Sequence, residues 1–248
     1  MSDLVPSHGA MVARGPREHD EVPVTGERFA KGAVDPDAFQ RVLRTVMSTI
    51  AERQVPYLMI GGLVSSTLGR SRESHDVDIL VAPRDAEQVL DALAEKGFDT
   101  EQTFPEWLFK ASMDGVLIDI LFCAGSTVYL DDEMLARGRP LEISDLTVHA
   151  ASAEDLLVTK VASHTEGAPR YWHDALSIIS RGELDWDYLV RRARFAARRV
   201  LSLLIYAQSE DLLVPDAAIR SLYDEIYGDG NDRLRGFSGV PSGQAMEA

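Results

Sequence analysis

Two short apolar segments constrain the fold of this chain most. A glycine pair follows the first segment, and a pair of aspartates begins the second. The first segment ends at Gly61-Gly62, and the second begins at Asp76-Val77-Asp78. The pattern predicts a strand, a short helix and a second strand: 55–60, 63–69 and 76–82. Because glycine has no side chain, the backbone at Gly61 and Gly62 can approach a phosphate closely.

Helical periodicity recurs along the rest of the chain, and a turn signal separates two further strands. Asp114-Gly115 is the preferred two-residue hairpin turn, and it predicts antiparallel strands at 107–113 and 116–122. The remaining expected helices are 35–54, 85–96, 152–164, 169–180, 185–208 and one that opens at Pro215. We therefore expect an α+β fold, with a mixed β-sheet flanked by helices and a helical subdomain at the C-terminal side.

The composition divides the chain into four parts. Residues 1–34 and 228–248 are rich in glycine, proline and charge without periodicity, and we expect both segments to be disordered. Between them we expect a catalytic domain over 35–150 and a helical subdomain over 151–227.

Charge and cysteine content limit the environment and the partners. The net charge of -15 disfavours duplex DNA as a partner, because a DNA-binding surface is normally basic. The single cysteine, Cys123, cannot form an internal disulfide, which fits a reducing compartment. No segment approaches about 20 uninterrupted apolar residues, so we expect a cytoplasmic protein without a membrane span.

Three aspartates are the candidate chemical groups. Asp76 and Asp78 lie two apart in a strand, so their side chains share one face and suit a hard cation such as Mg²⁺. Asp119 interrupts the apolar run 116–122, where an unpaired buried charge is costly, so a positive group should face it. If the two strands are neighbours, Asp119 completes a three-carboxylate cluster able to hold two magnesium ions.

These residues resemble the DNA polymerase beta-like nucleotidyltransferase superfamily. Its ordered pattern is an apolar strand, a glycine pair, a spacer, an acid-apolar-acid triplet and a third acid on a later strand. Here the pattern spans Ile60-Gly61-Gly62, Asp76-Val77-Asp78 and Asp119. A looser likeness to small bacterial members, including antibiotic nucleotidyltransferases and toxin-type enzymes, lies in the segments 155–160 and 170–174.

The resemblance implies transfer of a nucleoside monophosphate from a nucleoside triphosphate to a hydroxyl, with release of pyrophosphate. Asp76, Asp78 and Asp119 would be the catalytic metal ligands, and Asp119 would also orient or deprotonate the acceptor hydroxyl. The implied nucleotide-binding residues are Gly61, Gly62, Ser65, Ser66, Arg70, Arg72 and Lys160. Asp174 would position Lys160 or Arg170.

Several alternatives stay open. Asp76 and Asp78 could form a solvated strand entry, and Asp119 could belong to a structural ion pair. The loop arginines and Lys160 could be surface charges. The acceptor could be a small molecule, a protein or an RNA. A second hypothesis is a nucleotide-binding or antitoxin-like module that keeps the fold without turnover.

An arginine-rich segment at 191–199 is the one local exception to the acidic composition. On a helix, Arg191, Arg194 and Arg198 would form a stripe that could meet a nucleic-acid backbone. We favour the alternative of a solvated helix whose arginines pair with nearby acids, including Asp185, Asp187 and Glu210.

Overall fold

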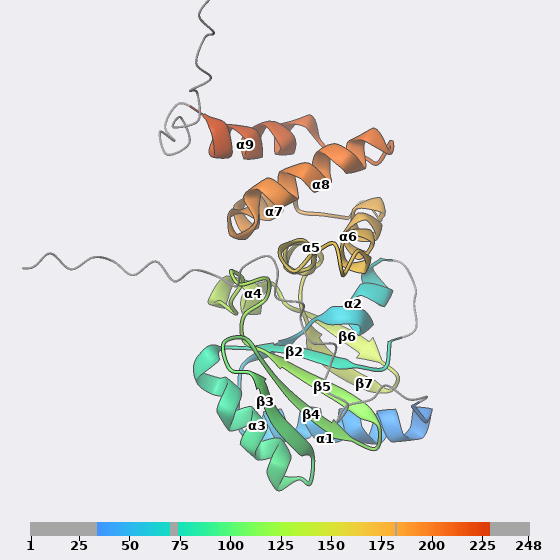
Figure 1. The fold of residues 1–248 in the computed structure, drawn as a ribbon. Coiled ribbons are helices and arrows are strands. Elements are labelled where there is room, and N and C mark those ends of the chain that lie inside the picture. The colour runs from blue at the N-terminus through green and yellow to red at the C-terminus, as the bar shows by residue number, and fades with distance from the viewer. Residues whose placement is uncertain (1–33, 70–73, 182, 229–248) are drawn as a thin grey trace, which may run out of the picture. The chain divides into compact units, whose positions relative to one another are not determined.

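The computed structural model describes residues 34–69, 74–181 and 183–228, which form a mixed β-sheet and surrounding helices (Figure 1). The strands are β1 Tyr57–Met59, β2 Val77–Val81, β3 Asp99–Phe104, β4 Leu108–Met113, β5 Val116–Leu121, β6 Arg139–Ile143 and β7 Leu146–Ala150. The α-helices are α1 Pro36–Glu52, α2 Gly61–Leu68, α3 Ala86–Glu95, α4 Asp132–Arg137, α5 Ala153–Ala162, α6 Arg170–Ser180, α7 Trp186–Arg192, α8 Ala197–Ser209 and α9 Asp216–Tyr227. Single 3-10 turns lie at Pro83–Asp85 and Ala193–Phe195.

The sheet has seven strands in the order β3-β4-β5-β2-β1-β7-β6. The pairs β2 with β5 and β1 with β7 are parallel, and the other neighbours are antiparallel. This arrangement confirms the α+β class and the mixed sheet. It also confirms that the hairpin strand β5 lies directly beside the strand that follows Asp76.

The predicted hairpin turn is present. Asp114 and Gly115 have φ angles of 51° and 79°, the left-handed conformation that a two-residue hairpin loop requires at both central positions. The turn pairs Met113 with Val116 and fixes the register of the whole hairpin. The sequence signal was therefore sufficient to place β4 against β5.

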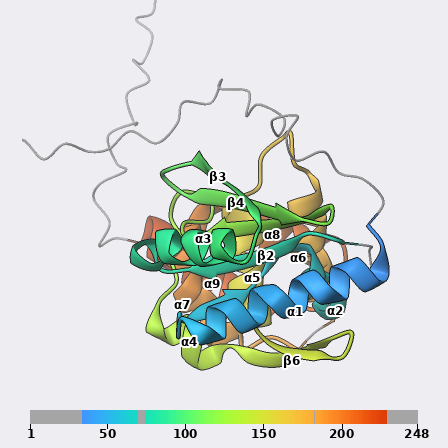
Figure 2. The same ribbon diagram turned by 90° about the horizontal axis from the view of Figure 1, so that it is seen from below.

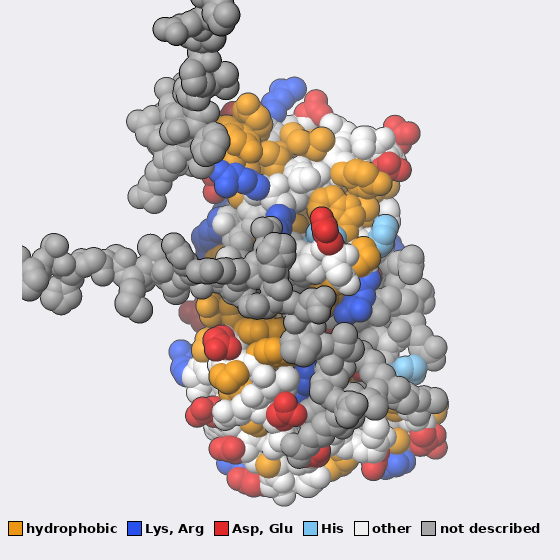
Figure 3. All heavy atoms as spheres, in the orientation of Figure 1, with side chains coloured by type: hydrophobic (Ala, Val, Ile, Leu, Met, Phe, Trp, Pro, Cys, Tyr) orange, Lys and Arg blue, Asp and Glu red, His pale blue; other side chains and the backbone are white. Residues whose placement is uncertain are grey.

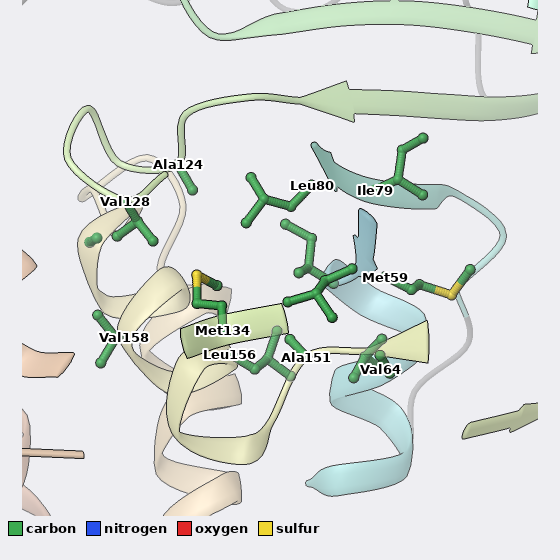
Figure 4. Close-up of a cluster of buried hydrophobic side chains, with 14 of the residues drawn as sticks. Met59, Val64, Ile79, Leu80, Ala124, Val128, Met134, Ala151, Leu156 and Val158 are labelled. Atoms are coloured by element: carbon green, nitrogen blue, oxygen red, sulfur yellow. The ribbon is translucent and has the colours of Figure 1, made fainter. Parts of the chain in front are cut away.

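Helices cover both faces of the sheet. Seen from below, α1 and α3 lie against one face (Figure 2), and they bury the apolar stripes that gave each helix its periodicity. On the other side lie α2, α4 and α5, with α6 to α9 beyond them (Figure 1). Figure 4 shows part of the core on this side, where Leu80 of β2, Met134 of α4 and Leu156 of α5 lie together. The same face of β2 carries Asp78, two residues before Leu80.

The prediction missed four elements and merged two. The missed elements are the polar strand β3, the short helix α4 and the hairpin of β6 and β7. The expected helix 185–208 is wrong as one helix, because the backbone breaks at Ala196, where φ is -152° and ψ is 39°. The residues around the break are good helix formers, so the break reflects tertiary packing rather than local sequence.

Residues 1–33 and 229–248, nearly all of the two expected disordered ends, lie outside the described residues. The proposed boundary between 150 and 151 stays a prediction. No helix in the described part of the chain is long and apolar enough to cross a membrane. Acidic and basic side chains are interspersed on the face shown in Figure 3, while orange hydrophobic side chains gather over α8 and α9. Tyr206 and Tyr223 are among the exposed aromatic side chains of these helices.

Candidate active site

The turn from β1 into α2 brings a backbone N–H group onto the carboxylate of Asp78. Gly61 opens α2 with a φ of +75°, which favours glycine. The N–H of Gly62 donates a hydrogen bond to Oδ2 of Asp78 at 3.3 Å. A Cβ atom at Gly61 would lie 1.9 Å from that oxygen, so only glycine fits here. The beginning of α2 therefore faces a negative group, as its helix dipole favours.

Asp78 and Asp119 are neighbours across the parallel strands β2 and β5. Their Cα atoms are register partners, so both side chains lie on the face that carries α2. Asp76 precedes β2 and is half-buried. Burial and the adjacent Asp119 raise the pKa of Asp78 to about 7, while the charge of Lys160 and the N–H of Gly62 oppose the rise. The acidic pair is thus short of positive charge at Asp78.

A buried lysine, Lys110 of β4, lies against Asp119 on the side of β5 away from Asp78. The sequence prediction did not include it. Nζ of Lys110 lies 2.6 Å from Oδ1 of Asp119, and the two side chains are 6% and 20% exposed. Lys110 is also the register partner of Asp119 between β4 and β5. The expected positive group facing Asp119 is therefore present. A two-residue turn at 114–115 already implies this pairing, so the hairpin register was the signal that could have found Lys110.

Lys160 lies on the helical side of the same region. Its Nζ is 3.1 Å from Oδ2 of Asp174, and both residues are buried. The ring of Tyr171 lies 5.0 Å from this Nζ and 5.1 Å from Cζ of Arg170. Lys160 is close enough to lower the pKa of Asp78. The structure thus pairs Asp174 with Lys160, one of the two partners expected for it, and rules out a surface position for this lysine.

The other predicted nucleotide-binding residues differ in how they are placed. The Ser65 hydroxyl donates to the carbonyl of Gly61 at 2.6 Å, and the Ser66 hydroxyl to the carbonyl of Leu63 at 2.7 Å. Both hydroxyl protons therefore bond within α2. Arg70 and Arg72 lie outside the described residues.

The expected metal site can be tested against this donor set. Asp78 and Asp119 supply hard oxygen donors side by side, the kind of donor that a divalent cation such as Mg²⁺ prefers. Among the described residues, no three histidine, cysteine or acidic side chains converge closely enough to hold one ion together. The donor chemistry therefore fits a divalent cation beside this acidic pair.

Two arginines of the arginine-rich segment, Arg192 and Arg199, join neighbouring helices. Arg192 is buried, with Nη1 2.5 Å from Oδ2 of Asp131 and Nε 2.9 Å from Oδ1 of Asp155. Arg199 donates from Nη1 to three carbonyls at the end of α5, the shortest at 2.6 Å to Ala162. The segment spans α7, a 3-10 turn and α8, so the stripe expected on a single helix is not formed.

The acids that pair with this segment are mostly not the expected ones. Arg191 contacts Glu133 at 3.5 Å, and Asp185 contacts Arg137 at 2.7 Å. Asp155 also accepts a hydrogen bond from the hydroxyl of Tyr188 at 2.8 Å. The favoured interpretation, a solvated helix paired with Asp185, Asp187 and Glu210, is therefore right only in that arginines pair with acids: the ion-pair partners are others, and Arg192 is buried.

A glycine turn that opens a helix beside an acidic pair on adjacent strands defines a nucleotidyltransferase-type domain. The model of a family described as uncharacterised nucleotidyltransferases matches residues 28–210, and the chain belongs to this family. The protein is accordingly an enzyme of the nucleotidyltransferase class. A comparison with curated proteins found no match.

Solved structures give distant likenesses. ANT(2″)-Ia in complex with adenylyl-2″-tobramycin is 16% identical, with a TM-score of 0.45 over 64% of this chain and 97% of that one. The lincomycin-bound lincosamide adenylyltransferase LnuA is 16% identical, with a TM-score of 0.42 over 59% and 99%. A putative nucleotidyltransferase from Thermotoga maritima is 19% identical, with a TM-score of 0.36 over 48% and 80%. Scores this low assign no substrate to the chain.

Proposed function

We propose that this protein transfers a nucleoside monophosphate from a nucleoside triphosphate to a hydroxyl group, in a magnesium-dependent reaction that releases pyrophosphate. The observation that carries the proposal is the register of Asp78 with Asp119 beside the beginning of α2. It joins a carboxylate pair for a hard cation to a backbone donor for phosphate. The membership of the chain in a nucleotidyltransferase family supports the same reaction class.

The glycine turn binds the triphosphate in this proposal. Gly61 keeps the approach to α2 free of a side chain, and the N–H of Gly62 already donates to an anionic oxygen. A phosphate oxygen has the same charge and acceptor character as that carboxylate oxygen. Lys160, held by Asp174, adds positive charge on the helical side.

Asp119 directs the acceptor. The acceptor hydroxyl oxygen forms a bond to the α-phosphorus, and the bond from that phosphorus to the pyrophosphate oxygen breaks. The hydroxyl proton passes to a base, and Asp119 is the candidate for this role. Magnesium, held by Asp76 and Asp78 beside Asp119, would neutralise the triphosphate and lower the pKa of the hydroxyl.

The acceptor is a hydroxyl on a small molecule, a protein or an RNA. The interspersed charges in Figure 3 give no large acidic patch on that face, so the net charge alone selects no cationic acceptor.

Transfer assays test the proposal. Each of the four labelled nucleoside triphosphates is incubated with Mg²⁺ and a panel of aminoglycosides, tRNAs and proteins. Asp78→Asn and Asp119→Asn should each lower transfer by about a hundredfold or more, whereas Asp91→Asn on the exposed face of α3 should not change it. Transfer that survives in both site variants contradicts the assignment of the site.

A second candidate is a nucleotide-binding module without turnover. The ion pair between Lys110 and Asp119 favours it, since Asp119 is already balanced by a protein cation. Binding of labelled nucleotide by wild type, with no transfer to any acceptor, would support this candidate. Loss of that binding in Gly61→Ala would place the nucleotide at the same turn.

A further inference from the structure

A row of charged side chains crosses four adjacent strands at the candidate site. Glu101 of β3 is the register partner of Lys110, Lys110 is the partner of Asp119, and Asp119 is the partner of Asp78. Register partners place their side chains on the same face of a sheet. Within this row, Lys110 makes its 2.6 Å contact with Asp119.

Folding stability alone gives a weak reason for this lysine. Lys110 is 5% exposed, and burying an ammonium group carries a large desolvation cost. Buried ion pairs are often no more stabilising than apolar residues of similar size. A cation kept here at that cost has its clearest use in balancing the charge of Asp119.

We propose that Lys110 acts as a built-in cation that takes the place of one of the two metal ions expected at the acidic cluster. With Lys160 paired to Asp174, the ionised forms of Asp76, Asp78 and Asp119 carry three negative charges, and Lys110 against Asp119 leaves two of them to be balanced. A single divalent ion on the Asp78 side balances these two charges. Lys110 is thus a positioning residue that holds Asp119 beside the acceptor while the metal ion binds at Asp78.

This inference rests on the proposed function, because it refines the metal content of the same site. It agrees with the finding that, in the described part of the chain, no three acidic, histidine or cysteine side chains form one metal cluster.

Equilibrium Mn²⁺ binding without nucleotide tests the inference independently of catalysis. Wild type should bind one ion per chain, measured by electron paramagnetic resonance of the free ion and by calorimetry. Lys110→Met should bind a second ion, or bind the first about tenfold or more tightly, because it removes a positive charge within a few ångströms. Lys110→Arg should behave like wild type, and so should Glu101→Gln, which changes the charge on the far side of Lys110.

A double variant covers the case in which Lys110→Met does not fold. Lys110→Met with Asp119→Asn removes both charges and keeps the net charge of the site, so it should bind one ion with near wild-type affinity. Loss of the ion in this double variant would show that Asp119 is the metal ligand, and would overturn the inference. Unchanged ion number and affinity in folded Lys110→Met overturns it as well, whether wild type binds no ion, one or two.

The outcomes for this inference and for the proposed function are separate. If the wild type transfers nucleotide and binds two ions, the proposed function stands and the role proposed for Lys110 is refuted. If the wild type transfers nothing to any acceptor while Lys110→Met gains an ion, the proposed function is refuted and the role proposed for Lys110 stands.

Discussion

The substitution Gly61→Ala tests the geometry of the site most directly. The substitution has two energetic costs. An alanine at a φ of +75° is in the left-handed region, which costs about 1–2 kcal/mol. The new Cβ would also lie 1.9 Å from Oδ2 and 2.5 Å from Cβ of Asp78. Rotation of the Asp78 side chain moves its oxygen away but leaves its Cβ in place, so the backbone of α2 or β2 must shift.

The second cost follows from that shift. Moving Asp78 away breaks the hydrogen bond from the N–H of Gly62, and a hydrogen bond to a charged group contributes about 1.5–3 kcal/mol. The free energy of unfolding of Gly61→Ala should therefore fall by about 2.5–5 kcal/mol. Because a displacement of about 1 Å costs roughly a hundredfold in rate, transfer should fall by about that factor even in the folded fraction.

Gly115→Ala is the matched control. Gly115 has a φ of +79°, and a Cβ atom there would meet nothing within 4 Å. It should lose only about 1–2 kcal/mol and keep full transfer. Urea unfolding followed by circular dichroism measures the stability, and single-turnover assays measure the transfer. Equal stability losses in Gly61→Ala and Gly115→Ala, with equal activity, would refute the reasoning.

Three further substitutions test the surrounding contacts. Lys160→Met removes one half of a buried ion pair, so urea unfolding should show a loss of about 3–5 kcal/mol, and a loss below 1 kcal/mol would contradict the pairing. Arg199→Ala should lose about 1 kcal/mol by leaving carbonyls at the end of α5 without their donor, whereas Arg198→Ala, at the adjacent position that is also exposed, should lose little. Burial alone would raise the pKa of Asp131, but the hydrogen bonds from Arg192 and a helix N–H hold it below its ordinary value. This carboxylate therefore stabilises the fold above about pH 4, and the stability gap between wild type and Asp131→Asn should close as the pH falls below that value; a gap that persists at low pH would exclude the ion pair as its source.

The first half of the site could be predicted because its signals are local. The glycine pair, the aspartates two apart and the turn at Asp114-Gly115 each act within a few residues of chain. Two of the strands that escaped prediction, β3 and β6, have weak local signals. Five of the six residues of β3 are polar, and β6 contains Pro140; both strands lie at the edges of the sheet, where alternation matters least.

The helical side of the site could not be predicted for a different reason. Lys160 and Asp174 lie on separate helices, and no periodic pattern states which faces of α5 and α6 meet. Arg192 appeared in sequence as one of several surface arginines, yet it is buried against Asp155 and Asp131. Such contacts depend on tertiary packing, which also sets the break at Ala196.

The positions of the two lysines of the site therefore depend on different features of the chain. Lys110 follows from a hairpin register that the sequence encodes in a two-residue turn, so its place beside Asp119 depends only on β4 and β5. Lys160 reaches the acidic pair only after α5 packs against α6 and α2, and its own charge is shared with Asp174. A change in helix packing would thus alter the charge near Asp78 while leaving Asp119 balanced. Substitutions in the helical layer should therefore weaken nucleotide binding, while the contact of Lys110 with Asp119 stays in place.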